Sequence, residues 1–169
     1  MPIVNTDLVM RLSGGAGNTD PNASLGGAIS STAVVDNTLN NLWDNTTGQE
    51  SNDGDIEYRG FYIRNSHGTL QANTTVIWVD SNTTGTGDTI DIGLGTSAIN
   101  GTEQTIADES TAPAGVSYSA PSTYATGLSI GNVPAGQHKA VWIRRTVTAG
   151  QGAKDNNTYV LKVQCDTQE

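Results

Sequence analysis

The sequence predicts an all-β protein, an antiparallel β-sandwich with a long, mostly irregular N-terminal arm. Only 15 % of the 169 residues are charged, and 20 are glycine. Together with abundant Thr, Asn and Ser, this composition favours strands and turns over helices. From Ile56 onward, short β-branched and aromatic runs alternate with turn residues at the spacing of a sandwich or barrel. We therefore expect an arm, residues 1–55, and a sandwich body, residues 56–169, with one core.

The arm contains one short strand candidate, Leu8–Leu12, and then SGGAGNTDPNASLGGAISS, which buries too little apolar surface to order by itself. Leu39, Leu42 and Trp43 follow at i, i+3 and i+4 behind Asp36 as N-cap, which predicts a short helix with one apolar edge. So short a helix is not stable alone. Its edge must dock on the body of its own chain or on a neighbouring chain, with Trp43 as the anchor.

The body is expected to contain further strands, each bounded by turn residues. The candidates are Ile56–Asn65, Thr74–Val79, Thr89–Leu94, Gly115–Ser119, Leu128–Ile130, Lys139–Val147 and Thr158–Cys165.

The first of these strands, in GDIEYRGFYIRNSHGT, carries a glycine in its aromatic run. Regular alternation leaves neither face cleanly apolar, because Glu57 and Arg59 share a side with Phe61. A β-bulge at Gly60 would switch the phase and collect the apolar side chains on one face. We expect this bulge; the alternative is a glycine that makes room for a neighbouring tryptophan.

In KAVWIRRTV, Val141, Ile143 and Val147 fall on one face, and Trp142 falls on the other beside Arg144. If the Val/Ile face is the core, Trp142 is an exposed aromatic next to an arginine, a composition enriched in interfaces. The alternative is that a loop covers it.

A formal net charge of −9 argues against a general nucleic-acid binder. Most acidic residues fall in predicted loops, whereas most basic residues fall in predicted strands, so acidic loops would surround basic sheet faces. The alternative is that the arginines form only the solvated side of ordinary strands. The basic residues concerned are Arg11, Arg59, Arg64, Lys139, Arg144, Arg145 and Lys162.

One cysteine, Cys165, excludes an intramolecular disulfide. The N-terminal residues lack the pattern of a signal peptide, and no run of 18 apolar residues occurs, so we expect a soluble protein without a membrane partner.

Catalytic motifs are missing from the sequence, which has only His67 and His138 as histidines and no nucleophile elbow or phosphate loop. We therefore expect a protein that is not an enzyme and needs no cofactor. His67, in NSHGT, is more simply a hairpin residue than a general base.

The stretch VDSNTTGTGDTID offers Asp80, Asn82 and Asp88 as oxygen ligands for calcium. It lacks the ligand spacing of an EF-hand. A polar hairpin connection uses the same residue types and is the favoured interpretation.

Three stretches together, LSGGAGN-x-DPNASLGGAIS, GDIEYRGFYIRN-x-HGT and GLSIGNVPAGQHKAVWIRRTV, resemble virion structural proteins of tailed bacteriophages. The last two also resemble Ig-like modules, and the sandwich expected is thus Ig-like or jelly-roll-like. The resemblance implies a head decoration, or cement, protein that is made in the host cytoplasm and binds the major capsid protein on the outer capsid surface. It also implies a homo-oligomer, with trimers at local three-fold positions as one arrangement.

The sequence leaves a second function open, an Ig-like tail or surface domain that binds host-cell carbohydrate through Trp78, Trp142 and Tyr124. For the decoration role, the composition change near Asp55 suggests that a chain shortened to this point would still fold but would attach weakly. The candidate interface residues are Leu39, Leu42, Trp43, Arg59, Arg64, Trp142 and Arg144.

Overall fold

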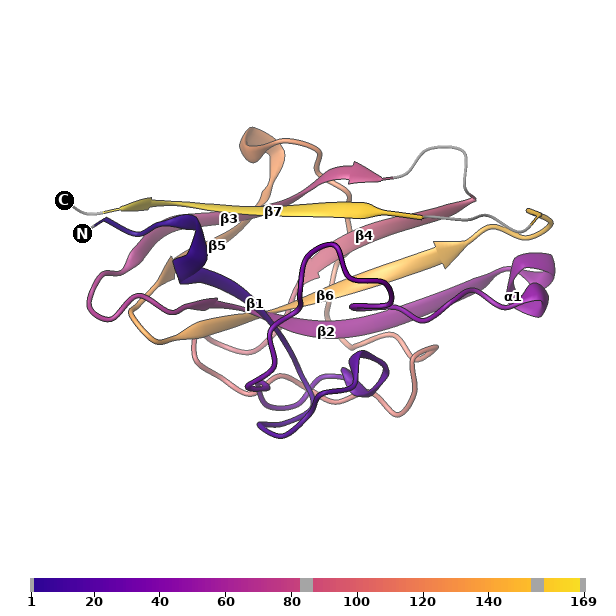
Figure 1. Cartoon of the computed structure of the whole chain (residues 1–169), viewed down its shortest axis with the longest axis horizontal. Helices are drawn as coiled ribbons and strands as arrows, with labels where there is room; N and C mark the ends of the chain where they lie inside the picture. Colours follow the sequence, from indigo (N-terminus) through magenta and orange to yellow (C-terminus); the bar gives the residue numbers. More distant parts are fainter. Residues whose placement is uncertain (1, 83–86, 153–156, 168–169) are drawn as a thin grey trace.

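The computed structural model describes residues 2–82, 87–152 and 157–167, and within them seven strands form two antiparallel sheets that pack face to face (Figure 1). The predicted β-sandwich is confirmed. One sheet has the order β1-β2-β6-β4 and the other β5-β3-β7. The strands are β1 (Leu8–Leu12), β2 (Asp55–Asn65), β3 (Ala72–Asn82), β4 (Asp88–Leu94), β5 (Leu128–Val133), β6 (His138–Val147) and β7 (Tyr159–Thr167).

One predicted strand, Gly115–Ser119, is wrong. Ser119 forms only an isolated bridge with Ile92 of β4. Gly115 has a positive φ of 72°, and prolines flank the segment, so the chain cannot remain extended along the sheet.

The predicted bulge at Gly60 is also wrong, because β2 pairs with β6 in an unbroken register that places Gly60 opposite Trp142. Phe61 and Ile63 point into the space between the sheets. Tyr58 lies on the opposite side of β2, in a second cluster with Trp142. β2 is thus buried on both faces, which is why its sequence shows no cleanly apolar side.

Gly60 makes room for backbone. Its N–H donates to the Ser24 carbonyl at 2.7 Å, and a Cβ on Gly60 would lie 3.2 Å from the Gly26 nitrogen and 3.1 Å from the Ser13 Oγ. The N-terminal segment therefore runs directly over the outer face of the four-stranded sheet.

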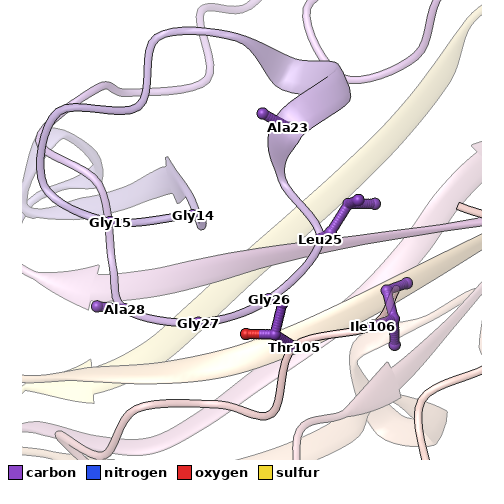
Figure 2. A pocket seen from close by; sticks show the side chains of 9 residues that line it. All are labelled: Gly14, Gly15, Ala23, Leu25, Gly26, Gly27, Ala28, Thr105 and Ile106. Carbon is purple, nitrogen blue, oxygen red and sulfur yellow. The ribbon is translucent and has the colours of Figure 1, made fainter. Parts of the chain in front are cut away.

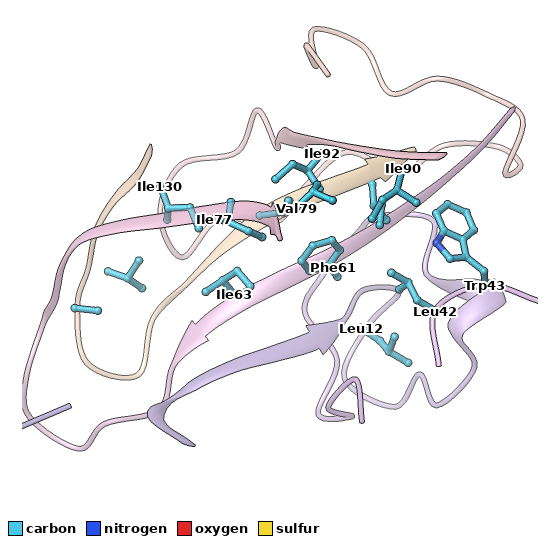
Figure 3. Packing of buried hydrophobic residues seen from close by; sticks show 14 residues of the cluster. Leu12, Leu42, Trp43, Phe61, Ile63, Ile77, Val79, Ile90, Ile92 and Ile130 are labelled. Atoms are coloured by element: carbon cyan, nitrogen blue, oxygen red, sulfur yellow. The ribbon is translucent and has the colours of Figure 1, made fainter. Parts of the chain in front are cut away.

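The core between the sheets is a single cluster (Figure 3). Residues of the N-terminal 55 belong to it, alongside those of both sheets. Its buried members are Leu12, Leu42, Trp43, Phe61, Ile63, Ala72, Ile77, Val79, Ile90, Ile92, Ile130, Val133, Val141 and Ile143.

The N-terminal segment also covers the free edge of β1. Backbone hydrogen bonds join Leu12 to Thr32 and to Ser30, and Val34 to Met10, at 2.8–3.1 Å. Residues 30–34 thus act as an irregular extra strand beside β1.

The helix predicted around Leu39, Leu42 and Trp43 is wrong. Asn37 and Asn40 adopt left-handed conformations, with φ of 56° and 57°, and these break a helix. The helix α1 instead spans Gly48–Asp53.

The N-cap of α1 is Thr47, whose backbone N–H donates to the Glu50 carboxylate at 2.7 Å while its Oγ1 accepts from the Glu50 N–H at 3.2 Å. Gly54 follows at a φ of 79° and ends the helix. Short 3₁₀ turns occupy Asn5–Asp7 (η1), Pro21–Ala23 (η2) and Tyr124–Thr126 (η3).

Candidate binding surfaces

The N-terminal segment is fixed to the sandwich at Trp43, which lies between two arginines of the four-stranded sheet. The guanidinium carbons of Arg59 and Arg145 lie 5.1 and 5.0 Å from the centroid of its ring. Figure 3 shows Trp43 at the end of the apolar cluster, next to Leu42. Cation–π attraction is strongest where water is excluded, and Trp43 is only 7 % exposed.

Acidic partners neutralise both arginines. Arg145 donates to the carboxylate of Glu57, on the neighbouring strand, and its Nη1 donates to the Asp44 carbonyl at 2.8 Å. Arg59 forms an ion pair with Glu109. Burial raises the pKa of Glu57, and the charge of Arg145 opposes that rise. We call Trp43, Asp44, Glu57, Arg59, Glu109 and Arg145 the Trp43 cluster.

The position of the Trp43 cluster changes the role of one interface candidate. Arg59 is wholly buried, so within this fold it contacts the chain's own Trp43 and Glu109 and cannot face a partner. Arg59 and Arg145 therefore lie inside the protein. They form neither an exposed basic sheet face nor the solvated side of an ordinary strand.

The turn that precedes Trp43 presents apolar side chains to solvent. Leu39 is 82 % exposed and Val35 is 60 % exposed. The side-chain amide of Asn41 donates to the Val35 carbonyl at 2.8 Å and closes the turn. We call residues 35–41 the Leu39 turn. Of the three apolar residues predicted for one helix edge, Leu42 and Trp43 are buried and Leu39 points outward.

Trp142 is fully buried, so the expectation of an exposed aromatic is wrong and the covering-loop alternative is confirmed. Its Cη2 atom lies against Gly26, where an added Cβ would be 3.0 Å from that atom. Ile106 and Tyr58 complete the cluster around it.

A cavity of about 390 Å³, open to solvent, is formed by the loops that cover Trp142 (Figure 2). Glycine backbone and mostly apolar side chains line it, and none of the lining residues has a side chain that titrates as an acid or base. The lining residues are Gly14, Gly15, Ala23, Leu25, Gly26, Gly27, Ala28, Thr105 and Ile106.

A second buried carboxylate, Glu103, fixes the loop after β4 through hydrogen bonds within that loop. Burial alone would raise its pKa, but hydrogen bonds from the Ser97 N–H and from the side chains of Thr96 and Gln104 lower the pKa to about 2. The Glu103 backbone N–H donates to the Tyr62 hydroxyl at 3.0 Å. The carboxylate bonds fix the loop internally, and the backbone bond to Tyr62 joins that loop to β2, so all of them are structural.

Arg144 is partly exposed and engaged within the chain. Its Nη2 lies 2.6 Å from the Asp91 carboxylate, and its guanidinium lies 5.1 Å from the ring of Tyr118. Asp91 raises the pKa of Arg144. Arg64 is half-buried near the end of β2. Among the described residues, no hydrogen bond, ion pair or ring contact joins Arg64 to Leu39 or Arg144.

The candidate calcium ligands bind protein groups. Asp80 accepts from Trp78 at 3.2 Å and pairs with Lys162 at 3.0 Å; Asn82 accepts from the Ile90 N–H, and Asp88 from the Asn157 amide. Residues 83–86 of this loop lie outside the described residues. Within residues 2–82, 87–152 and 157–167, no group of three or more His, Cys, Asp or Glu side chains is placed to hold a metal ion.

The three aromatic residues considered for carbohydrate binding do not form one platform. Trp78 and Tyr124 meet edge to face, with ring centroids 6.0 Å apart. Trp78 and Trp142 are buried, and Tyr124 alone is more than a third exposed.

His67 lies in the loop that carries the chain from β2 to β3 and thus from one sheet to the other. Its Nδ1 accepts the backbone N–H groups of Thr69 and Leu70 at 3.1 and 2.9 Å. The predicted hairpin is wrong, because the loop joins strands of two different sheets, and His67 instead binds the backbone of this crossing loop.

No protein-family model matches the chain, and neither curated proteins nor solved structures show significant similarity to it. Among the described residues, no helix is long and apolar enough to cross a lipid bilayer.

Proposed function

We propose that this chain is a non-enzymatic virion protein that decorates the outer surface of a tailed-phage head and strengthens the shell through repeated contacts with the major capsid protein. The sequence resemblance to phage virion proteins motivates the role. The observation that supports a specific contact site is the Leu39 turn, where Leu39 is 82 % exposed on a turn that a hydrogen bond closes.

The turn is suited to this task because its base is fixed. Leu42 and Trp43 follow it directly and are buried in the sandwich. A pre-ordered anchor binds with a smaller entropy cost than an arm that must fold on its partner. Each contact is then small, and many copies on one shell provide the avidity.

The other charged groups support a binding role in preference to catalysis. Glu57, Arg59 and Arg145 form ion pairs that join segments of the chain, and Glu103 binds loop backbone. These groups stabilise the fold, and the open cavity near Gly26 lacks titratable lining.

The test is occupancy on empty heads that are assembled from the major capsid protein encoded with this chain. Leu39→Asp should reduce occupancy about tenfold or more, because a charge would replace the leucine that the capsid protein buries on binding. Val4→Asp is the matched control, since Val4 is also exposed, at 53 %, but lies outside the turn. Equal binding by Leu39→Asp and the unmodified chain, or no binding by the unmodified chain, would contradict the proposal.

The carbohydrate-binding alternative depends on Tyr124, which is the exposed member of the aromatic set. A glycan array with the isolated protein separates the two functions. Saturable binding to host-envelope glycans that Tyr124→Ala removes, without binding to heads, would favour the alternative.

A further inference from the structure

The outer edge of β7 is the least protected strand edge of the sandwich. Figure 1 shows β7 as the nearest strand of its sheet, with no other strand in front of it. It pairs with β3 on one side, and among the described residues no backbone hydrogen bond reaches its other side. By contrast, residues 30–34 cover β1, and Ser119 bonds to β4.

β7 is also regular enough to accept a further strand. The two register shifts in its pairing with β3 add residues to β3 and leave β7 continuous. The other outer strand of this sheet, β5, is shorter, and Gly131 at a φ of 85° interrupts it. Short or irregular edges resist pairing, whereas a long regular edge invites it.

The inward side chains of β7 are not fully covered by the sandwich. Tyr159, Leu161, Val163 and Cys165 pack against the core but stay half-buried. A strand added at this edge would cover the apolar side chains that the sandwich leaves partly open.

We propose that β7 pairs antiparallel with β7 of a second copy of this chain, centred on Gln164, so that two three-stranded sheets become one continuous sheet. The two copies are related by a two-fold axis perpendicular to the sheet. Each β7 residue then lies opposite a residue of the second copy whose side chain is on the same face of the sheet. Centring on Gln164 sets Lys162 opposite Asp166 of the second copy, and the symmetry forms this pair twice. On the inner face, Val163 meets Cys165.

Charge selects this register among the symmetric ones. Centring on Lys162 would set two lysines face to face, which destabilises a strand pair. Centring on Val163 sets Lys162 opposite Gln164 and leaves Asp166 without a basic partner across the axis. Lys162 pairs with Asp80 and Asp166 accepts from Thr74 within each chain, and among these three registers only the one centred on Gln164 adds an opposite charge across the axis for both.

The inference is independent of attachment to a phage head and is tested on the isolated full chain. Sedimentation equilibrium measures the mass at rising concentration, to about 1 mM, and the unmodified chain should approach twice the monomer mass. A chain that remains a monomer over this range would overturn the proposal.

Two substitutions at the centre test the geometry. Gln164→Glu and Gln164→Lys each place two like charges across the axis, so each should raise the dimer dissociation constant at least tenfold. An equimolar mixture should restore dimers, because glutamate then faces lysine.

The mixture also serves as the folding control, since a misfolded variant could not restore pairing. Dimerisation of both single variants at the unmodified level, or a mixture that stays monomeric, would overturn the Gln164 register. A stable trimer would overturn the two-fold arrangement and favour the three-fold one that the resemblance implies.

Discussion

The two faces of the four-stranded sheet are both buried, but by different means. The inner face meets the second sheet, and at its end Trp43 closes the gap between Arg59 and Arg145. On the outer face, loops without regular structure lie over Gly60 and Trp142. The inner cover depends on apolar packing and ion pairs, and the outer cover depends on close backbone contact and hydrogen bonds.

The N-terminal segment is therefore part of the folded body on both sides of this sheet. Segments before Asp55 supply β1, the Trp43 anchor and the backbone that touches Gly60. The Leu39 turn is therefore held by the fold before any partner arrives.

Removal of residues 1–54 should have the largest effect, because it uncovers both faces at once. Arg59, Arg145 and Trp142 would lose their cover, so we expect no cooperative urea unfolding transition from the shortened chain. This reverses the expectation from composition that the body folds alone. A shortened chain that unfolds cooperatively near the midpoint of the full chain would show that the covers are dispensable.

Trp43→Ala tests the inner cover alone. Loss of a buried indole should lower the free energy of unfolding by about 3–5 kcal/mol, measured by urea denaturation. The matched control in the same segment is Leu39→Ala, which should change it by less than about 0.5 kcal/mol, since Leu39 is exposed. Equal effects of the two substitutions would mean that Trp43 does not anchor the segment.

Glu103→Gln tests the outer cover through its hydrogen bonds. At pH 7 the free energy of unfolding should fall by about 2–3 kcal/mol, because an amide cannot accept the same bonds to Ser97 and Thr96. Asp36→Asn, at an exposed carboxylate, is the control.

The pH dependence of this difference has a defined sign. The pKa of Glu103 is about 2 in the folded chain, below its ordinary value of 4.5. Its contribution is therefore fully present above pH 4.5 and is lost as the pH falls toward 2. Stability curves of the two proteins should converge over that interval; parallel curves would contradict the role of Glu103.

Gly60→Val should have the smallest effect, a loss of about 1–3 kcal/mol by thermal or urea unfolding, because its side chain would press on Gly26 and Ser13. Gly17→Val is the control, since nothing lies within 4 Å of a Cβ at Gly17. Unchanged stability of Gly60→Val would mean that the outer cover is loose.

Most of the strands could be predicted because their alternation and turn residues are local features. β2 shows the limit of such local features. Glu57 and Arg59 fall on the inward side, and two charged residues there suggested a bulge. They are buried without one because they pair with Arg145 and Glu109, which are distant in sequence. The helix α1 carried a local capping box, Thr47 with Glu50, whereas the i, i+3, i+4 pattern at Leu39 was overridden by two asparagines in left-handed turns.

The candidate interface could be predicted less well than the fold. Exposure of Leu39 and burial of Arg59 and Trp142 depend on which segment covers which face. The cover over Trp142 is made by glycine-rich loops whose contacts are through backbone, and such contacts leave no pattern in side-chain polarity. The cover over Arg59 is made by Trp43 and Glu109, which are distant from it in sequence.

Amide hydrogen exchange of Gly60 and Tyr58 in the isolated full chain tests the account most directly. The Gly60 N–H donates to the Ser24 carbonyl and the Tyr58 N–H donates to the Glu109 carbonyl, and neither acceptor belongs to a strand. The N–H groups of Arg59 and Phe61 point to the other side of β2, toward β6. We expect all four N–H groups to exchange slowly and at similar rates. Fast exchange at Gly60 and Tyr58 beside slow exchange at Arg59 and Phe61 would show a loose N-terminal arm that orders only on its partner.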